Sequence, residues 1–295
     1  MNTVALELAP PKLPAAASQA TEEAGAAAEL CRRSGLRDRV RHVMIPGIIA
    51  EDRDRPAPFT PRMPVLDYWE PVRRAFGTVA GLCTQVTVFH DARHLDQRVH
   101  RLRDAGMDGV IFVGKPRGLP SSDAPGVRPE EALARFRELV PHRGVVLIPT
   151  RRDELDRLDV KCRSGATFAL TQLLYSDRIA DFLREFGART EHHPEILLSF
   201  GFVPGIEQRV RLIDWLIHDR GNDLARQDQE FVARVAAGSF RQRRDALVDL
   251  YRRIVDGVHD LGFPLSVHLE APYGLSGAAC ETFAAMLDHW TPQPP

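Results

Sequence analysis

The sequence predicts an α/β fold, a single (β/α)8 barrel, from three observations. Short apolar segments that suit buried parallel strands alternate with amphipathic segments that suit helices, without a compositional break. Eight strand segments of this kind are present, which is the number that closes such a barrel. No Gly-x-Gly-x-x-Gly turn follows any of them, which counts against an open doubly wound sheet, the topological rival.

The predicted strands are short and mostly apolar. They cover residues 3–8, 42–47, 83–89, 109–114, 144–149, 166–172, 195–200 and 264–270. Parallel strands that are covered by helices on one face and packed inside a barrel on the other have this composition. We therefore expect one catalytic TIM-barrel domain over residues 1–290, followed by a disordered tail over residues 291–295.

Helical segments lie between the strands and carry start and stop signals. Residues 92–106 place Leu95, Val99 and Leu102 on one face, with Asp91 as a helix N-cap and Gly106 as a C-cap. Further helices are expected over residues 15–29, 128–140, 206–219 and 241–262.

Two segments depart from the simple repeat. Residues 49–64 form a long Pro- and charge-rich loop after the second strand, and a loop of that length in a compact domain is usually functional or mobile. Residues 219–240 add an extra helical segment before the last barrel helix.

Composition and charge exclude several classes of protein. The 295 residues are 44% apolar and 27% charged, which is too apolar for general disorder. The net charge of −1 gives no bulk attraction to nucleic acid or to an anionic membrane. No apolar run approaches the roughly 18 residues of a membrane span, and residues 1–11 lack the pattern of a signal peptide. We expect a cytoplasmic protein.

The cysteines predict neither a metal site nor a disulfide framework. They are widely scattered, without the paired spacing of zinc ligands. Reduced thiols are the default in the cytoplasm. The four are Cys31, Cys83, Cys162 and Cys280.

In a barrel of this kind the active site lies at the carboxyl ends of the strands. Glu7 lies near the end of a strand that is otherwise apolar, so its carboxylate needs an explanation. Burial raises the pKa of a carboxyl group. A carboxylic acid kept protonated near neutral pH suits a general acid, although pairing with a barrel Arg or Lys is an equal alternative. Gln172 closes the apolar strand 166–172, either as a core amide bonded to backbone or as a ligand-binding group.

Three stretches together resemble the methylenetetrahydrofolate reductase family. "LELAPPK" (6–12) is similar to its Phe-Glu-Phe-Phe-Pro-Pro-Lys/Arg strand, and residues 84–118 follow its third strand, helix and fourth strand. "SGATFALTQLLYSDRIADFLREFG" (164–187) is similar to its Ala-Gly-Ala-Asp-Phe-Ile-Ile-Thr-Gln-Leu-Phe-Phe-Asp segment and the helix after it, with Thr171 and Gln172 in place. In the family the last strand has the pattern Val-His-Phe-Tyr-Thr-Leu-Asn, and the corresponding segment of this chain is "SVHLEAPYG".

The resemblance implies reduction of 5,10-methylenetetrahydrofolate to the 5-methyl form. Glu7 matches the glutamate that promotes opening of the methylene bridge, and Gln172 matches the glutamine that binds the pterin ring. Thr171 and Gln85 are expected beside the substrate, Gln85 standing at a family histidine. Two aromatic residues are expected to flank the pterin or p-aminobenzoate ring, although simple packing is their alternative: Tyr175 and Phe200.

The chain departs from the family at the flavin contacts. Residues 114–118 read Gly-Lys-Pro-Arg-Gly where the family has Arg-Gly-Asp-Pro-Pro, so Lys115 takes the place of an aspartate. The family's Tyr-Pro-Glu-x-His-Pro-Glu loop is replaced by Ile-Pro-Thr-Arg-Arg at 148–152. The sequence therefore resembles the flavin-independent branch, in which NADH is a co-substrate that gives its hydride directly to the folate. We expect no bound FAD.

Residues at the barrel mouth are then candidates for binding NADH. They are Glu51, Thr87, Lys115 and Arg151. For the basic ones, including Arg117 and Arg152, the alternative is a solvated loop charge.

Two other functions stay open. One is an FAD-dependent reductase with a divergent flavin site, and the other is a catalytically silent folate-binding barrel. The expected partners are small molecules alone, with no nucleic acid and no membrane, in a monomer or small homo-oligomer. The choice between NADH and NADPH and the oligomeric state stay open.

Overall fold

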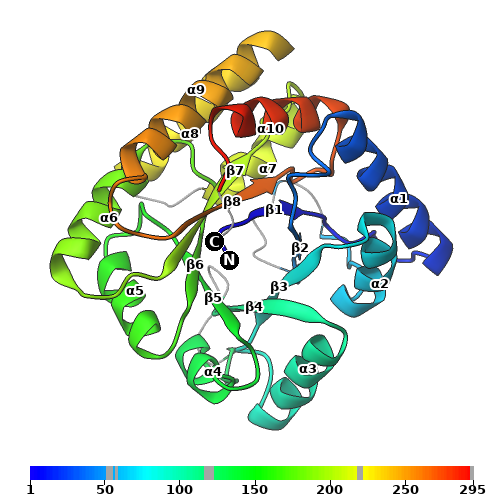
Figure 1. Ribbon diagram of the computed structural model, residues 1–295, viewed down its shortest axis with the longest axis vertical. Helices are drawn as coiled ribbons and strands as arrows, with labels where there is room; N and C mark the ends of the chain where they lie inside the picture. Colours follow the sequence, from blue (N-terminus) through cyan, green and yellow to red (C-terminus); the bar gives the residue numbers. More distant parts are fainter. Residues whose placement is uncertain (51–55, 57–58, 116–122, 218–221, 293–295) are drawn as a thin grey trace.

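The computed structural model describes residues 1–50, 56, 59–115, 123–217 and 222–292. Within these residues, eight parallel strands close into a barrel in sequence order, from β1 round to β8. The helices form a ring outside the strands (Figure 1). This is the predicted (β/α)8 barrel, and the prediction of the fold class is confirmed.

Each strand pairs with its neighbours in the chain, and β8 pairs with β1 to close the barrel. Most lie within two or three residues of their predicted positions. They are β1 (Val4–Glu7), β2 (His42–Ile45), β3 (Ala80–Val86), β4 (Met107–Val113), β5 (His142–Leu147), β6 (Phe168–Thr171), β7 (Glu195–Gly201) and β8 (Leu265–Glu270). The strand β3 begins three residues earlier than predicted, because the preceding helix ends at Phe76 and Gly77 turns the chain with a φ of 64°.

Helices lie at the predicted segments and also over residues 65–76, 154–163 and 277–289, where none was predicted. They are α1 (Ala17–Arg33), α2 (Val65–Phe76), α3 (Ala92–Asp104), α4 (Pro129–Arg135), α5 (Glu154–Arg163), α6 (Arg178–Arg189), α7 (Glu207–Ile217), α8 (Asp223–Ala236), α9 (Phe240–Val258) and α10 (Gly277–His289). The start of α3 is as predicted, since the Asp91 carboxylate accepts a hydrogen bond from His94 N at 2.8 Å.

The extra helical segment is present as α8, within the predicted residues 219–240. It precedes α9, which packs between α6 and α10 in the outer ring, so the last barrel helix is α10 (Figure 1). No helix was predicted over α10, because its sequence is apolar on most sides and gives little helical periodicity.

Two apolar layers hold the barrel together. The larger lies between strands and helices, and the smaller fills the barrel interior with residues such as Met44, Ile111 and Phe168. Large and small side chains alternate inside: a Cβ on Gly144 would lie 2.3 Å from the Phe168 ring and 2.6 Å from Ile111. Because large side chains fill the space beside small ones, the barrel interior is a packed core. A ligand-binding or active site can then lie only at the strand ends.

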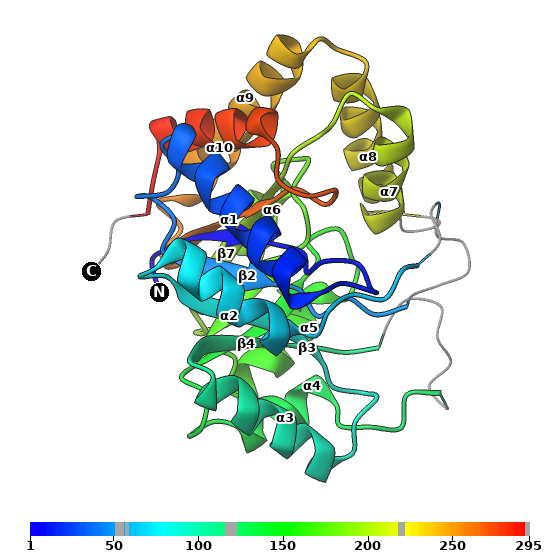
Figure 2. The ribbon, with the colours of Figure 1, turned by 90° about the vertical axis from the view of Figure 1, so that its right-hand side faces the viewer.

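The two ends of the barrel differ. The amino terminus lies at one side in Figure 2, and the helix pair α7–α8 lies at the opposite side. That side holds the carboxyl ends of the strands, called the mouth below.

The two unusual segments are described in part. Residues 59–64 of the predicted long loop lie beside residues 11–13, with Leu13 N donating to Pro61 O at 2.8 Å and Met63 N donating to Pro11 O at 2.9 Å. In the predicted tail, Thr291 donates to Leu287 O at 2.8 Å, and residues 293–295 lie outside the described residues. Across the described chain, no helix is both long and apolar enough to cross a membrane.

Polar side chains gather at the amino-terminal end of the barrel. Asp108 lies 3.1 Å from His42 Nε2 and 3.5 Å from His142 Nε2, and Thr3 Oγ1 lies 2.7 Å from His42 Nδ1. The hydrogen bond from His42 lowers the pKa of the Asp108 carboxyl group, and the charge of His142 adds to the effect. The folded protein therefore favours the ionised aspartate.

We expect Asp108→Asn to lower the free energy of unfolding by about 1 kcal/mol at pH 7, since a partly exposed charged hydrogen bond is lost. A lowered folded-state pKa stabilises the protein above the unfolded-state value, so the deficit should disappear as the pH falls through the folded-state pKa. Denaturant unfolding at pH 7 and below pH 4, with the exposed Asp38→Asn variant as control, measures this. An equal deficit at both pH values would contradict the ion-pair account.

Candidate functional site

The two-residue period of the strands decides which side chains point into the barrel. Ala5, Leu170 and Leu197 lie in the interior layer. Residues an even number of positions further along each strand face the same way, so Glu7 and Gln172 point inward at the mouth. Glu270 also points inward, because its neighbour on β7 is Gly201, four residues after Leu197.

Glu7 ends β1 with its carboxyl group at the mouth. Its side chain is 15% exposed, so the carboxyl is largely buried but still reaches the opening of the barrel. Burial raises its pKa well above the ordinary value, and the nearby carboxylate of Glu270 raises it further. Its nearest ion-pair partner among the described residues is His268, whose Nε2 lies 3.8 Å from Glu7 Oε2. Pairing of Glu7 with a lysine or arginine, the sequence alternative, is absent among the described residues.

His268 is a neutral neighbour of this acid. It is 1% exposed, and burial lowers its pKa to about 3. Its Nδ1 lies 3.0 Å from the hydroxyl of Ser199, while its Nε2 has no hydrogen-bond partner among the described residues. The imidazole therefore presents Nε2 toward Glu7 without a positive charge.

Glu270 and Tyr175 complete the acidic side of the mouth. Burial raises the pKa of Glu270 to about 7. The Tyr175 hydroxyl is buried without a hydrogen-bond partner among the described residues, and burial and the charge of Glu270 raise its pKa. A Cβ on Gly201 would lie 2.3 Å from that hydroxyl, so only glycine leaves room for it. The sequence places Glu270 and His268 at the end of the predicted strand 264–270 but gives them no role, although Glu270 shows the same signal as Glu7: an acid ending an apolar strand.

Gln172 is tied to the helix pair at the mouth. Its Nε2 donates to Leu216 O of α7 at 2.7 Å, whereas no described residue donates to its Oε1. Half of the amide is satisfied by backbone, as the core interpretation requires, and the acceptor half is left for another group. The amide groups are therefore oriented by α7.

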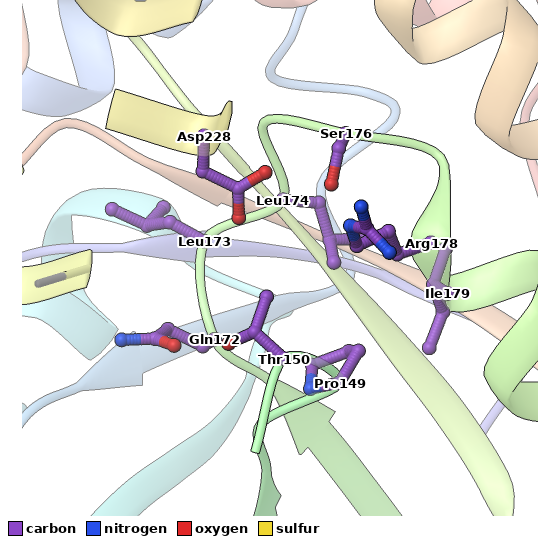
Figure 3. A pocket seen from close by; sticks show the side chains of 9 residues that line it. All are labelled: Pro149, Thr150, Gln172, Leu173, Leu174, Ser176, Arg178, Ile179 and Asp228. Atoms are coloured by element: carbon purple, nitrogen blue, oxygen red, sulfur yellow. The ribbon is translucent and has the colours of Figure 1, made fainter. Parts of the chain in front are cut away.

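A small cavity adjoins Gln172 (Figure 3). Its volume is about 10 Å³, about enough for one water molecule. Asp228 of α8 lines it with an Oδ1 that has no described hydrogen-bond partner, and Arg178 lines it with an equally unpartnered Nε. Burial raises the pKa of Asp228 to about 6, against the lowering effects of Ser176 and Arg178.

Three predicted substrate residues face the helices, away from the mouth. The Phe200 ring packs on Tyr251 of α9 with centroids 4.6 Å apart, and the Thr171 hydroxyl accepts from Ser199 N at 2.8 Å. Gln85 donates to Val86 O at 2.7 Å and accepts from Arg98 of α3 at 3.0 Å. The structure does not bring them to the mouth, because each is an odd number of residues from an inward-facing residue of its strand and therefore points outward.

The predicted NADH-binding residues are scattered. Thr87 is buried after β3, with its N–H donating to Val113 O at 3.0 Å, and Lys115 is exposed after β4. Arg151 pairs with the buried carboxylate of Glu154 at 3.1 Å. Glu51 lies outside the described residues.

The mouth therefore holds buried acids and a neutral histidine at the ends of β1 and β8, with an amide acceptor after β6. Such an arrangement can donate a proton from a carboxylic acid and accept a hydrogen bond from a bound heterocycle. Among the described residues, no three His, Cys, Asp or Glu side chains gather as metal ligands.

Comparison with solved structures places the fold among known barrels. The chain is similar to an uncharacterized protein from Clostridium thermocellum that binds two copies of 5-methyl-5,6,7,8-tetrahydrofolic acid, with 15% identity, a TM-score of 0.67, and 98% of this chain and 95% of that chain covered. It is also similar to a putative deoxyribose-phosphate aldolase from Toxoplasma gondii ME49, with 12% identity, a TM-score of 0.50 and the same coverage. At these identities the likeness concerns the fold. No curated protein matches the sequence.

The sequence pattern described as mycobacterial methylenetetrahydrofolate reductase matches residues 1–294, almost the whole chain. With its barrel and its inward-facing glutamate and glutamine at the mouth, the chain belongs to the mycobacterial methylenetetrahydrofolate reductase family.

Proposed function

We propose that this protein reduces 5,10-methylenetetrahydrofolate to 5-methyltetrahydrofolate with a hydride taken directly from NADH. The observation that carries the proposal is the inward-facing, largely buried Glu7 carboxyl at the mouth of a barrel of this family, where burial raises its pKa. Family membership supports a folate-related enzyme, and so does the folate-binding structural neighbour.

Glu7 supplies the proton. The methylene bridge opens when one of its two C–N bonds breaks, and the nitrogen that leaves takes the proton from the Glu7 carboxyl. The carbon stays on the other nitrogen as an iminium and accepts the hydride, so NADH becomes NAD⁺ and the methyl group is complete. Solvent then returns a proton to the Glu7 carboxylate. Burial raises the pKa of Glu7 well above its ordinary value, which favours the protonated acid that this step requires.

Gln172 recognises the pterin. The ring edge offers N–H donors, and Gln172 Oε1 is an acceptor without a described donor. Because Leu216 O holds the amide nitrogen, the oxygen is oriented before substrate arrives, which lowers the entropic cost of binding.

The flavin positions of the parent family fit FAD poorly in this chain. A lysine, Lys115, stands where the family has an aspartate, and the amide of Gln85 is engaged with Arg98 behind the barrel wall. Arg151 is held by Glu154. These placements support a reaction in which NADH and folate meet directly in a ternary complex, held at near-attack distance. NADH binding by Thr87, Lys115, Arg151 and Glu51 belongs to this proposal.

The first test is a visible spectrum of the purified protein, followed by NADH oxidation with methylenetetrahydrofolate and no added flavin. We expect a colourless sample that turns over. A yellow sample would favour the alternative hypothesis of an FAD-dependent reductase. A colourless, inactive sample would favour a catalytically silent folate-binding protein.

We expect Glu7→Gln to fold normally and to lose about 100-fold or more in kcat, because loss of a general acid typically costs this much. Steady-state kinetics with a melting curve measure both properties. The exposed Glu22→Gln variant of α1 is the matched control and should keep the wild-type rate. A near wild-type rate for Glu7→Gln would remove Glu7 from the reaction.

We expect Gln172→Ala to weaken folate binding about tenfold, the equivalent of roughly 1.4 kcal/mol, while NADH binding stays within twofold. Calorimetric titration measures both ligands. Gln85→Ala is a matched control on the opposite face of the barrel wall, and it should lower stability without changing folate affinity. Unchanged folate affinity in Gln172→Ala would assign Gln172 to core packing alone.

A further inference from the structure

We propose that Glu270 is a positioning residue for Glu7: the two carboxyl groups share one proton, and Glu270 thereby keeps Glu7 in the form that donates. The catalytic meaning of this pair rests on the proposed function. The shared proton itself is a property of the ligand-free protein and can be tested without substrate.

The strand register brings the two acids together. Strands β1 and β8 pair in parallel with Ala5 opposite His268 and Leu6 opposite Leu269, so the next residues, Glu7 and Glu270, also stand opposite each other. Neighbouring strands lie about 4.8 Å apart, and both residues end their strands pointing inward. The charge of Glu270 raises the pKa of Glu7, as expected for adjacent carboxyl groups.

No cation in the part of the chain that the structure describes offsets the two acids. Among the described residues, no lysine or arginine lies within 4.0 Å of either carboxylate, and neither has a hydrogen bond from another side chain. Two partly buried carboxylates this close cannot both ionise at low cost, so one proton stays with the pair over a wide pH range.

The other groups that face the pair do not change this result. His268 is neutral, and the buried hydroxyl of Tyr175 carries its proton. Asp228 of α8 adds negative charge near Tyr175, and Ser199 does not titrate. On the β7 side Gly201 has no side chain, and on the β2 side the interior neighbour is the apolar Met44.

The pair has a direct consequence for the reaction. With Glu270 ionised, the proton on Glu7 is held to a higher pH than burial alone would achieve. When Glu7 gives that proton to the substrate nitrogen, the pair becomes a dianion and takes a proton back from solvent. Glu270 touches no reacting atom in this scheme and acts through Glu7.

The first experiment is a double-mutant cycle on the ligand-free protein. Melting temperatures are measured from pH 4 to pH 8 for the wild type, Glu7→Gln, Glu270→Gln and the double variant. A carboxyl with a raised folded-state pKa binds a proton that the unfolded chain releases, so stability falls as the pH rises from about 4.5 towards 7.

We expect the wild type to lose several degrees over this range and each single variant to lose much less. Each single variant still loses some stability, because burial raises the pKa of its remaining carboxyl, and the double variant should lose the least. The wild-type loss should exceed the sum of the two single-variant losses, measured from the double variant, because only the wild type has two carboxyl groups competing for a proton. Asp228 titrates in the same window with the same sign, so Asp228→Asn is the matched control and should leave the Glu7–Glu270 coupling intact. Effects of the two single substitutions that simply add in the double variant would overturn the proposal.

The second experiment is the pH profile of turnover. We expect the alkaline limb of kcat for Glu270→Gln to move to lower pH by about one unit or more, with near wild-type turnover kept at acidic pH. A uniform loss at every pH would mean a structural role and would overturn the proposal. If no form of the protein turns over but the ligand-free cycle shows coupling, the shared proton stands and the proposed reaction falls.

Discussion

The two-residue period of a strand in a closed barrel is the constraint on which this site depends. A barrel has no free sheet edge, so each strand end must send its side chains either into the mouth or into the layer beneath the helices. The side chains of Glu7, Gln172 and Glu270 point into the barrel, whereas those of Thr171 and Phe200 point outward to the helices. One residue of register separates a candidate catalytic group from a packing residue.

The helix pair α7–α8 is the second determinant of the mouth. It is joined to the strand ends at two points: Gln172 Nε2 donates to Leu216 O of α7 at 2.7 Å, and Asn222 Nδ2 at the start of α8 donates to Thr150 O at 2.6 Å. The pair also brings Asp228 against the loop after β6. An insertion that interrupts the simple repeat is thereby part of the site, because it orients the amide and adds a carboxyl group.

The sequence was informative about the order of strands and helices along the chain, and less so about which side chains point into the barrel. Alternating apolar segments are enough to predict the barrel, and an acid in the apolar strand β1 marks Glu7. Periodicity could not distinguish the inward and outward faces of β3, β6 and β7, because both faces of a covered strand are apolar. The prediction that Gln85, Thr171 and Phe200 lie at the mouth was therefore wrong. The partner of Glu7 could have been found, since a closed barrel of eight strands in sequence order makes β8 the neighbour of β1, and Glu270 ends β8.

The treatment of buried acids elsewhere in the chain shows what is unusual at the mouth. Glu154 has no exposed side-chain area and lies between Arg151 Nη1 at 3.1 Å and Lys161 Nζ at 3.0 Å. Asp108, which is partly exposed, has two histidines beside it. Each arrangement offsets the cost of removing a carboxylate from water. Glu7 and Glu270 have no such partner among the described residues, so there the same cost is met by retaining a proton. A stability-optimised barrel would place a cation or an apolar residue at these positions; an acid that must hold and then release a proton cannot be paired that way without losing its use.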